Sequence, residues 1–439
     1  MTGVATTTGT DTAGVRARTA RATGAWLRTG TRLMTDNVPE PGSGRVLYVA
    51  TLINSTGTGM FLASSALFFT RCVGLSAASV GTGLSLGALI GLAAGVPVGA
   101  LADRRGPREV YACTLAIEAT AMTAFVFVHA YWLFVVIATL TGTAATASYA
   151  ARGPLVRVLG AARPTLLRAR IRSATNLGIA IGGLGSAAAL EVNTRSAYLT
   201  LVLLNAASFA ACSGCVLRLP RAPATKKQGE KTSGGVWRDR PYAALTALNL
   251  VLMMQYPVLT LVLPLWIFDH TRVPHVLAAI AIPLNTLMVT VLQVRLTRGI
   301  ESPTKAARVM VRAGLALLVS LTLMAAAAEV PTWLAIVLVP VSTVVYTLGE
   351  IWFSGAGYEL SFELARQDAQ GEYQGFYAMG GGLGRAVSTS VVTFACLVCG
   401  FPGWLLFGGL LLAAALPTPW VVGWAQRRTL ESADPEPAV

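Results

Sequence analysis

The sequence predicts an all-α integral membrane protein with twelve transmembrane helices, arranged as two halves of six. Of its 439 residues, 54% are hydrophobic and only 12% are charged, which is roughly half the charged share of an ordinary soluble domain. The charged residues lie in short gaps between apolar segments of roughly 20 residues, the length of helix that crosses about 30 Å of hydrocarbon. A polar, basic stretch separates the first six segments from the last six. These observations exclude a soluble globular fold.

Apolar segments bounded by charged residues, Pro or Gly define the predicted helices. The first six are expected near residues 46–70, 76–102, 109–129, 131–153, 173–190 and 196–217, in a bundle over 45–217. The second six are expected near 242–267, 275–295, 309–328, 332–356, 374–398 and 403–424, in a bundle over 241–426. The composition of 218–240 is that of a linker. Residues 1–44 lack the apolar run of a signal peptide and are expected to be a disordered tail, and 427–439 a second tail.

Basic residues predict which side of the membrane each loop occupies. If the N-terminus is cytoplasmic, the outer loops hold only Arg71, Arg195 and Arg272. The inner segments then hold most of the others, including Arg104, Arg105, Arg108, Arg157, Arg163, Arg168, Arg170, Arg172, Arg298, Lys305 and Arg308. This asymmetry predicts that both termini and the linker are cytoplasmic. It also accounts for the formal charge of +14 without a nucleic-acid partner.

Glycines mark close helix packing in the second predicted helix. Gly83, Gly87, Gly91, Gly95 and Gly99 recur every fourth residue, so they lie along one side of the helix, where a neighbouring helix can approach closely. One hypothesis is that this side is a sliding interface between the two halves, and the alternative is static packing.

A faint internal repeat supports two equivalent halves. The fifth and eleventh predicted helices both contain GGLG, at 182–185 and 381–384. Parallel repeats of six helices are one known plan of membrane transporters, with the substrate site between the halves near the membrane midplane.

The loop after the second predicted helix carries a motif. It reads GALADRRGPR and resembles motif A of the major facilitator superfamily, G-x-L-A-D-R-x-G-R-[KR], with Pro107 in place of an arginine and with matches at Gly99, Leu101, Ala102, Asp103, Arg104, Gly106 and Arg108. The resemblance extends over residues 45–426 and implies the major facilitator fold. It further implies that Asp103 accepts hydrogen bonds from the N-terminal amides of the eleventh helix, where the helix dipole favours an anion, and so closes the cytoplasmic side.

Two further stretches resemble the drug:proton antiporters of that superfamily. TNLGIAIGGLGSA is similar to their fifth-helix motif, with matches at Gly178 and Gly182, while Gly183 replaces the proline. The GE dipeptide in the tenth helix and the Gly-rich start of the eleventh are similar to bacterial multidrug exporters. The resemblance implies proton-driven efflux of a small amphipathic compound, such as a drug, antibiotic or secondary metabolite, with the proton gradient as energy source and no cofactor. The alternatives are transport of a defined metabolite (an amino acid, sugar or peptide-like compound) and a membrane sensor that does not transport.

Three ionisable residues are predicted to lie inside the membrane, where each costs roughly 2.5 to 3.5 kcal/mol. Glu350 in the tenth helix is the first candidate for proton binding, because the resemblance implies that this helix lines the central cavity. The alternative role is a structural ion pair with Arg385 of the eleventh helix. Glu118 in the third helix is the second candidate for proton binding, and Arg385 could instead hold an anionic group of the substrate.

Amide, aromatic and Met side chains on the helices expected to face the cavity suit amphipathic organic molecules. The candidates are Asn54, Tyr149, Asn176, Asn249, Gln255, Tyr256, Tyr346 and Trp352, with Met253, Met254 and Asn285 beside them.

Enzyme chemistry is not expected. The sequence has no G-x-x-x-x-G-K-[ST] loop and no HExxH, and its one G-x-S-x-G string, GLSLG at 83–87, lies within a predicted helix rather than on a strand-to-helix turn. The two CxxC pairs lie in or at the ends of apolar runs with no histidine nearby, so no metal site is expected. We expect a monomer in the lipid bilayer of a bacterial cytoplasmic membrane, with a small molecule as its substrate.

Overall fold

The computed structural model describes residues 37–160, 163–221 and 235–433, and in these ranges every regular element is helical. The first half contains α2 (Ser43–Leu67), α3 (Ala77–Leu92), α4 (Gly95–Arg105), α5 (Pro107–Ala124), α6 (Tyr131–Gly160), α7 (Pro164–Val192) and α8 (Arg195–Leu217). The second contains α9 (Arg240–Met253), α10 (Leu263–His270), α11 (Val276–Thr297), α12 (Pro303–Ala326), α13 (Thr332–Glu363), α14 (Gln370–Thr393), α15 (Gly400–Ala415) and α16 (Thr418–Ala433).

These helices account for the twelve predicted membrane spans. Within the described residues, nine helices are long and apolar enough to cross a membrane. Two bent pairs, Ser43–Leu62 with Ser64–Cys72 and Ala78–Leu92 with Gly95–Arg105, bring the number to eleven. The remaining span is α7, whose 29 residues are long enough to cross at about 1.5 Å per residue, although arginines in its first third lower its hydropathy. Large apolar side chains such as Leu184 and Leu406 are exposed on the outer surface, as expected for a surface that faces lipid. The chain is therefore a multi-pass membrane protein.

Two boundaries differ from the prediction. The structure starts α7 at Pro164 rather than near residue 173, so Arg168 and Arg172, predicted to be in a cytoplasmic loop, lie within the bundle. α16 continues to Ala433, beyond the predicted start of the C-terminal tail. Most of the predicted N-terminal tail (1–36) and the middle of the linker (222–234) lie outside the described residues. Asn37 is nevertheless buried and donates a hydrogen bond to the Thr290 carbonyl of α11 at 2.9 Å.

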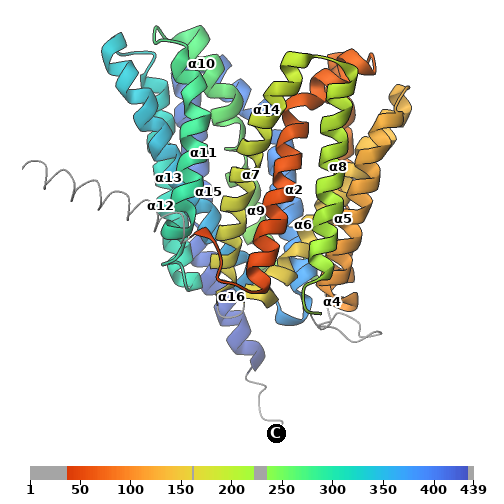
Figure 1. Cartoon of the computed structure of the whole chain (residues 1–439). Coiled ribbons are helices and arrows are strands. Elements are labelled where there is room, and N and C mark those ends of the chain that lie inside the picture. Colours follow the sequence, from red (N-terminus) through yellow and green to blue (C-terminus); the bar gives the residue numbers. More distant parts are fainter. Residues whose placement is uncertain (1–36, 161–162, 222–234, 434–439) are drawn as a thin grey trace, which may run out of the picture.

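The two halves repeat the same packing around the GGLG segments. In the first half, α7 packs on α2, and Gly178 and Gly182 lie against the α2 backbone, while Gly183 faces open space. In the second half α14 packs on α9, where Gly384 lies against the Leu250 carbonyl. The pairs α2–α7 and α9–α14 are thus equivalent elements of the two halves. The halves lie side by side in Figure 1.

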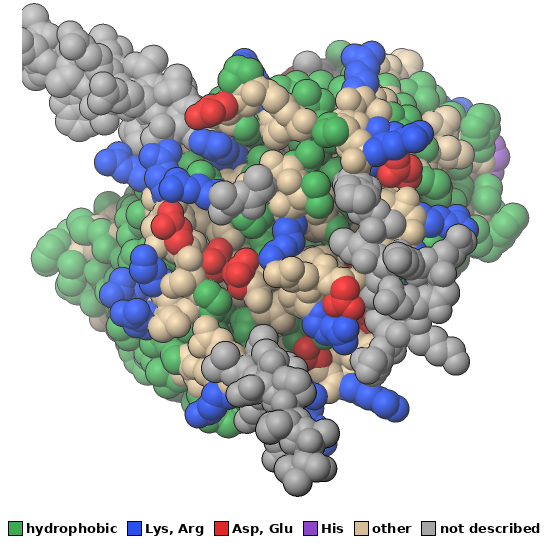
Figure 2. All heavy atoms as spheres, turned by 90° about the horizontal axis from the view of Figure 1, so that it is seen from below, with side chains coloured by type: hydrophobic (Ala, Val, Ile, Leu, Met, Phe, Trp, Pro, Cys, Tyr) green, Lys and Arg blue, Asp and Glu red, His purple; other side chains and the backbone are tan. Residues whose placement is uncertain are grey.

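The halves are joined at one end of the bundle, which we call the closed face. This end carries the starts of α2, α7 and α14 and the end of α13, and lies at the bottom of Figure 1. Hydrogen bonds join the halves toward this end, for example from the Arg157 guanidinium to the Phe362 carbonyl at 2.9 Å and from the Ser173 hydroxyl to the Thr290 carbonyl at 2.7 Å. Figure 2 shows the closed face with Lys and Arg side chains at several places on it. The last turn of α4, at the same end of the bundle, contains Arg104 and Arg105.

The second span bends by 47° between α3 and α4, and the bend divides its glycine stripe. Gly83, Gly87 and Gly91 lie against α6 of their own half. Gly95 and Gly99 lie beyond the bend against Gly375 and Gly371 of α14, in the other half. Of the five glycines, only the last two therefore make the predicted contact between the halves. The first three pack on a helix of their own half.

Candidate functional site

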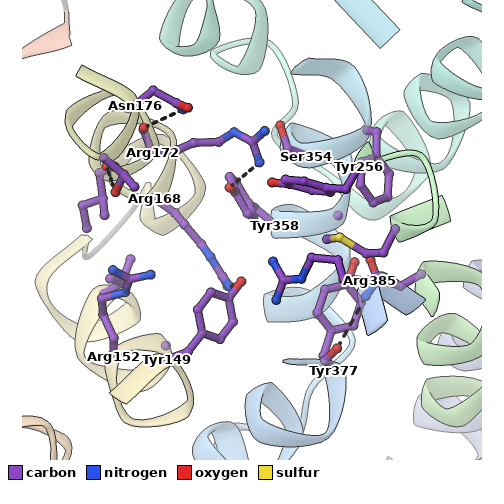
Figure 3. Close-up of a pocket in the computed structure, with 18 of the residues that line it drawn as sticks. Tyr149, Arg152, Arg168, Arg172, Asn176, Tyr256, Ser354, Tyr358, Tyr377 and Arg385 are labelled. Atoms are coloured by element: carbon purple, nitrogen blue, oxygen red, sulfur yellow. Dashed lines mark hydrogen bonds between the residues drawn. The ribbon is translucent and has the colours of Figure 1, made fainter. Parts of the chain in front are cut away.

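A cavity of about 260 Å³ lies between the halves, close to the low end of ligand-pocket volumes. Its walls come from α6 and α7 on one side and from α9, α13, α14 and Tyr256 on the other. The lining contains four arginines, four tyrosines and several amide or hydroxyl side chains, but no Asp or Glu: Tyr149, Arg152, Gly153, Val156, Arg168, Ile171, Arg172, Thr175, Asn176, Ile179, Asn249, Met253, Tyr256, Phe353, Ser354, Gly357, Tyr358, Tyr377 and Arg385. Figure 3 shows Arg152, Arg168 and Arg172 on one side and Arg385 pointing toward them from the other.

Tyr256 reaches the cavity because the membrane span formed by α9 and α10 (240–270) is interrupted beside it. Pro257 has no N–H to donate and disfavours a continuous helix, so α9 ends at Met253, and a turn leads into a π-helical segment at Val258–Val262. The backbone carbonyl of Gln255 in this turn accepts a hydrogen bond from the Tyr346 hydroxyl at 2.8 Å. The interruption is thus held by a neighbouring span, and it leaves the Tyr256 ring partly exposed to the cavity.

Arg168 is held in one position by polar and aromatic groups. Its guanidinium donates to the Tyr149 hydroxyl at 2.7 Å and to the Gln374 side-chain carbonyl at 2.8 Å. It also lies over the rings of Tyr358 and Phe362, at 4.7 and 4.9 Å from their centroids. Because Gln374, Tyr358 and Phe362 belong to the second half, Arg168 links the halves, and it does so without an ion pair to any described residue.

Glu350 forms an ion pair across the halves, but its partner is Arg172 rather than Arg385. The Arg172 and Glu350 side chains meet at 2.5 Å and are each 13% exposed. The second carboxylate oxygen of Glu350 accepts a hydrogen bond from Asn285 of α11 at 2.8 Å. The expected pairing with Arg385 was wrong because α7 begins earlier than predicted and brings Arg172 into the bundle.

Arg385 and Arg152 each lie beside a tyrosine ring. The Arg385 guanidinium carbon lies 5.6 Å from the Tyr256 ring centroid, and that of Arg152 lies 5.4 Å from the Tyr149 centroid. Neither arginine forms a hydrogen bond or an ion pair with any residue in the described ranges.

Glu118 lies in a second cavity, inside the first half. This cavity of about 280 Å³ is lined by residues of α2, α5, α6 and α8, among them Asn54. Glu118 is only 4% exposed, and its carboxylate accepts a hydrogen bond from the Ser148 hydroxyl. It forms no ion pair with another residue of the described chain. Tyr149 and Arg152 line both cavities and separate this acid from the central one.

At the closed face, Asp103 binds the N-terminus of α14. Its two carboxylate oxygens accept hydrogen bonds from the Gly371 N–H at 2.7 Å and the Glu372 N–H at 3.0 Å. Asp103 is 2% exposed, and the amides that it binds have no partner within their own helix. This is the contact with the eleventh span that motif A implies for an aspartate at this position.

The family model described as "Major Facilitator Superfamily" matches residues 47–389. The chain belongs to the major facilitator superfamily. Family membership and the fold together indicate transport across a membrane. No curated protein matches the sequence.

Solved structures share the facilitator fold at low sequence identity. The human organic anion transporter MFSD10 (TETRAN) is 15% identical, with a TM-score of 0.66 over 87% of this chain and 100% of its own. A bacterial homologue of the iron transporter ferroportin in an outward-facing state is 15% identical, with a TM-score of 0.67 over 88% of this chain and 100% of its own. A mutant of the nucleoside transporter NupG is 16% identical, with a TM-score of 0.55 over 87% of this chain and 100% of its own. These similarities show the fold alone.

The predicted cavity residues of this facilitator are divided among three places. Tyr149, Asn176, Asn249 and Tyr256 line the central cavity. Asn54 lines the second cavity. Gln255 and Tyr346 are buried within the second half, where Trp352 packs against the apolar core.

Arg168, Arg172 and Tyr358 line the cavity and were missing from the predicted set. Arg168 and Arg172 are four residues apart, a spacing that places both on one side of a helix. This spacing is the feature of the sequence that could have indicated their place in the cavity.

The other residues of motif A lie at the turn between α4 and α5. Arg108 donates to the Leu219 carbonyl at 2.7 Å, and Gly106 has a φ of 98°. Leu101 and Arg104 are exposed at the end of α4.

The charge of Asp103 should stabilise closure of this face. Hydrogen bonds to a charged acceptor contribute roughly 1.5–3 kcal/mol, against 0.5–1.5 kcal/mol for neutral ones, so Asp103→Asn should increase the open population several-fold. Closure can be followed by distances between spin labels at Arg163 and Glu301, exposed residues of opposite halves whose side chains approach to 3.8 Å. Asp269→Asn, at an exposed position, is the control, and an unchanged distance distribution in Asp103→Asn would contradict the assignment.

Proposed function

We propose that this facilitator is a proton-coupled exporter of a small amphipathic organic compound, working by alternating access as a monomer in a bacterial cytoplasmic membrane. Under this proposal the closed face is cytoplasmic, in agreement with the basic residues on it and the positive-inside rule. No cofactor is required, because the proton gradient supplies the energy.

The observation that carries proton coupling is the environment of Glu118. The carboxyl is buried, and among the described residues its hydrogen-bond partner is the Ser148 hydroxyl, which also lies 2.9 Å from the Thr114 hydroxyl. A buried carboxylate that forms no ion pair is costly. Arg152 lines the same cavity, so a change in the distance between this arginine and Glu118 will favour uptake or release of a proton. The arginine and tyrosine shared by both cavities, Arg152 and Tyr149, connect such a change to the substrate site.

Glu350 is the weaker candidate for this role. Its carboxylate is already compensated by Arg172 and Asn285, and a compensated charge has less reason to take up a proton. We therefore assign Glu350 to the contact between halves and Glu118 to proton exchange.

Export is tested by comparing the growth of cells that produce the wild-type protein with cells that produce the Asp103→Asn variant, across a panel of antibiotics and organic acids. Compounds tolerated better with the wild type are then assayed in proteoliposomes with imposed proton gradients. Transport that follows the proton gradient supports the proposal. Transport that ignores the gradient would refute proton coupling, and a wild-type protein that sensitises cells would refute export.

Glu118→Gln should uncouple transport from protons. Gln keeps the hydrogen bond to Ser148 but cannot exchange a proton, so substrate binding should persist while uphill transport is lost and its dependence on pH disappears. Gradient-driven flux in proteoliposomes measures this, with Glu191→Gln at an exposed position of α7 as control. If Glu118→Gln keeps gradient-driven transport, another group carries the proton.

A further inference from the structure

The central cavity carries more positive charge than the carboxylates of the described residues pair with. Of its four arginines, only Arg172 contacts a carboxylate, that of Glu350. Arg168 is satisfied by neutral groups, and Arg152 and Arg385 have ring contacts alone within the described residues. Glu118, the buried acid of the first half, lies in the second cavity, which Arg152 also lines, but no ion pair joins the two among the described residues.

Such an arrangement is expensive for a protein in a membrane. Each arginine at membrane depth costs roughly 2.5–3.5 kcal/mol unless a partner or water compensates it. One arginine packed on a tyrosine ring could be explained by packing, because the long side chain covers apolar surface. Two arginines from opposite halves line one cavity, Arg152 on α6 and Arg385 on α14, and Arg385 points toward the first half in Figure 3. This arrangement indicates a negatively charged ligand.

We propose that the cavity binds an amphipathic organic anion, with its carboxylate or phosphate group between Arg385 and Arg152 and its apolar body against the rings of Tyr149, Tyr256 and Tyr358. Guanidinium groups bind these oxyanions through paired hydrogen bonds, and tyrosine rings offer large apolar surfaces with little loss of side-chain entropy. The volume of about 260 Å³ limits the ligand to a small molecule in this conformation. This inference rests on the proposed function only in taking the ligand to be the transported substrate.

The position of the charges also suggests how binding acts on the protein. Arg152 belongs to the first half and Arg385 to the second, so the two guanidinium groups repel each other across the cavity when it is empty. An anion bound between the two guanidinium groups attracts both of them and offsets their mutual repulsion. Binding should therefore draw the two walls together above the closed face.

The inference is tested with benzoate, phenyl phosphate, benzamide and benzylamine, which share one ring and differ in charge. Binding to the purified full-length protein is measured by titration calorimetry and by the ligand-dependent shift of thermal unfolding, in phosphatidylcholine nanodiscs. The two anions should bind at least tenfold more tightly than benzamide, and benzylamine should bind no better than benzamide. A panel without this dependence on charge, including one in which nothing binds, overturns the proposal.

Arginine variants then locate the site. Arg385→Gln and Arg152→Gln should each weaken binding of the anions at least tenfold and leave benzamide unchanged, whereas Arg308→Gln, at an exposed position of α12, should change neither. Arg385→Lys keeps the charge but loses the paired geometry, so its anion affinity should lie between those of the wild type and Arg385→Gln. Anion binding that Arg385→Gln and Arg152→Gln leave intact would place the ligand elsewhere and overturn the proposal.

A third arm separates a free solute from a lipid headgroup. If the arginines bind a soluble anion, benzoate affinity should be the same in phosphatidylglycerol nanodiscs, and its loss there would instead assign the site to a lipid phosphate and refute a transported solute. None of these measurements needs a proton gradient or transport. Failure here would thus refute the anionic ligand alone, while the gradient experiments would refute proton-coupled export.

Discussion

Arg172→Ala is expected to open the closed face. The substitution leaves the Glu350 carboxylate without its cation at a site where both side chains are only 13% exposed, and breaking one side of a buried ion pair typically costs about 3–5 kcal/mol. Because the pair joins α7 of one half to α13 of the other, an opening of the halves would let water reach Glu350. The cost should therefore fall on the closed conformation, whose population relative to the open one should drop at least a hundredfold, at about 1.4 kcal/mol for each factor of ten.

Spin-label distances between positions 163 and 301 measure this change. Glu350→Gln is the informative companion, because its side-chain carbonyl can still accept from Arg172 and closure should weaken far less. The double variant Arg172→Met/Glu350→Met, which replaces the pair by apolar side chains, should recover most of the closure, since such replacements of buried pairs are often neutral. Full closure in Arg172→Ala would show that the pair contributes little to joining the halves.

Gly99→Ala should destabilise the closed conformation through a steric clash. A methyl group at Gly99 would overlap the carbonyl of Gly371, a backbone group that cannot move aside without shifting the start of α14. Overpacking of this kind costs roughly 1–3 kcal/mol or more. The same shift would pull the α14 amides away from Asp103, which contacts Gly371 and Glu372, so we expect the closed population to fall by a factor of about ten to a hundred.

The matched control is Gly81→Ala on the same span. Nothing lies within 4 Å of a methyl group there, so any general effect of replacing a helical glycine will appear in both variants, and only Gly99→Ala should change the label distances. Equal distances in the two variants would mean that α4 and α14 do not need their close approach for closure.

The fold was largely predictable because bilayer thickness imposes helix length, and apolar segments of that length are visible in sequence. The start of α7 was not predictable by the same means. Average hydropathy treats all sides of a helix alike, so Arg168 and Arg172 indicated a loop. In the structure one side of α7 carries these arginines into the cavity, while Gly178 and Gly182 on another side pack on α2.

The sequence indicated which helices line the cavity, but not which face of each helix points into it. Tyr149 and Tyr256, chosen as aromatic side chains on helices expected to face the cavity, do line it. Gln255 and Tyr346 belong to cavity-lining spans too, yet they point into the second half, where the Tyr346 hydroxyl binds the Gln255 carbonyl. Helices that are apolar on all sides give no pattern from which their rotation can be read. The partner of Glu350 was missed for a related reason, because it depended on where α7 begins.

The arginine-lined cavity also makes the protein sensitive to voltage. Guanidinium groups within the bilayer lie in its electric field, and moving one elementary charge through the whole field corresponds to about 2.3 kcal/mol per 100 mV. Under the proposed alternating access, the cavity opens in turn to the two sides, and its arginines then pass through part of that potential without moving far in space. The resting conformation of the empty protein in a polarised membrane is therefore set by the membrane potential as well as by the contacts of the closed face, and a bound anion would reduce that sensitivity by cancelling charge.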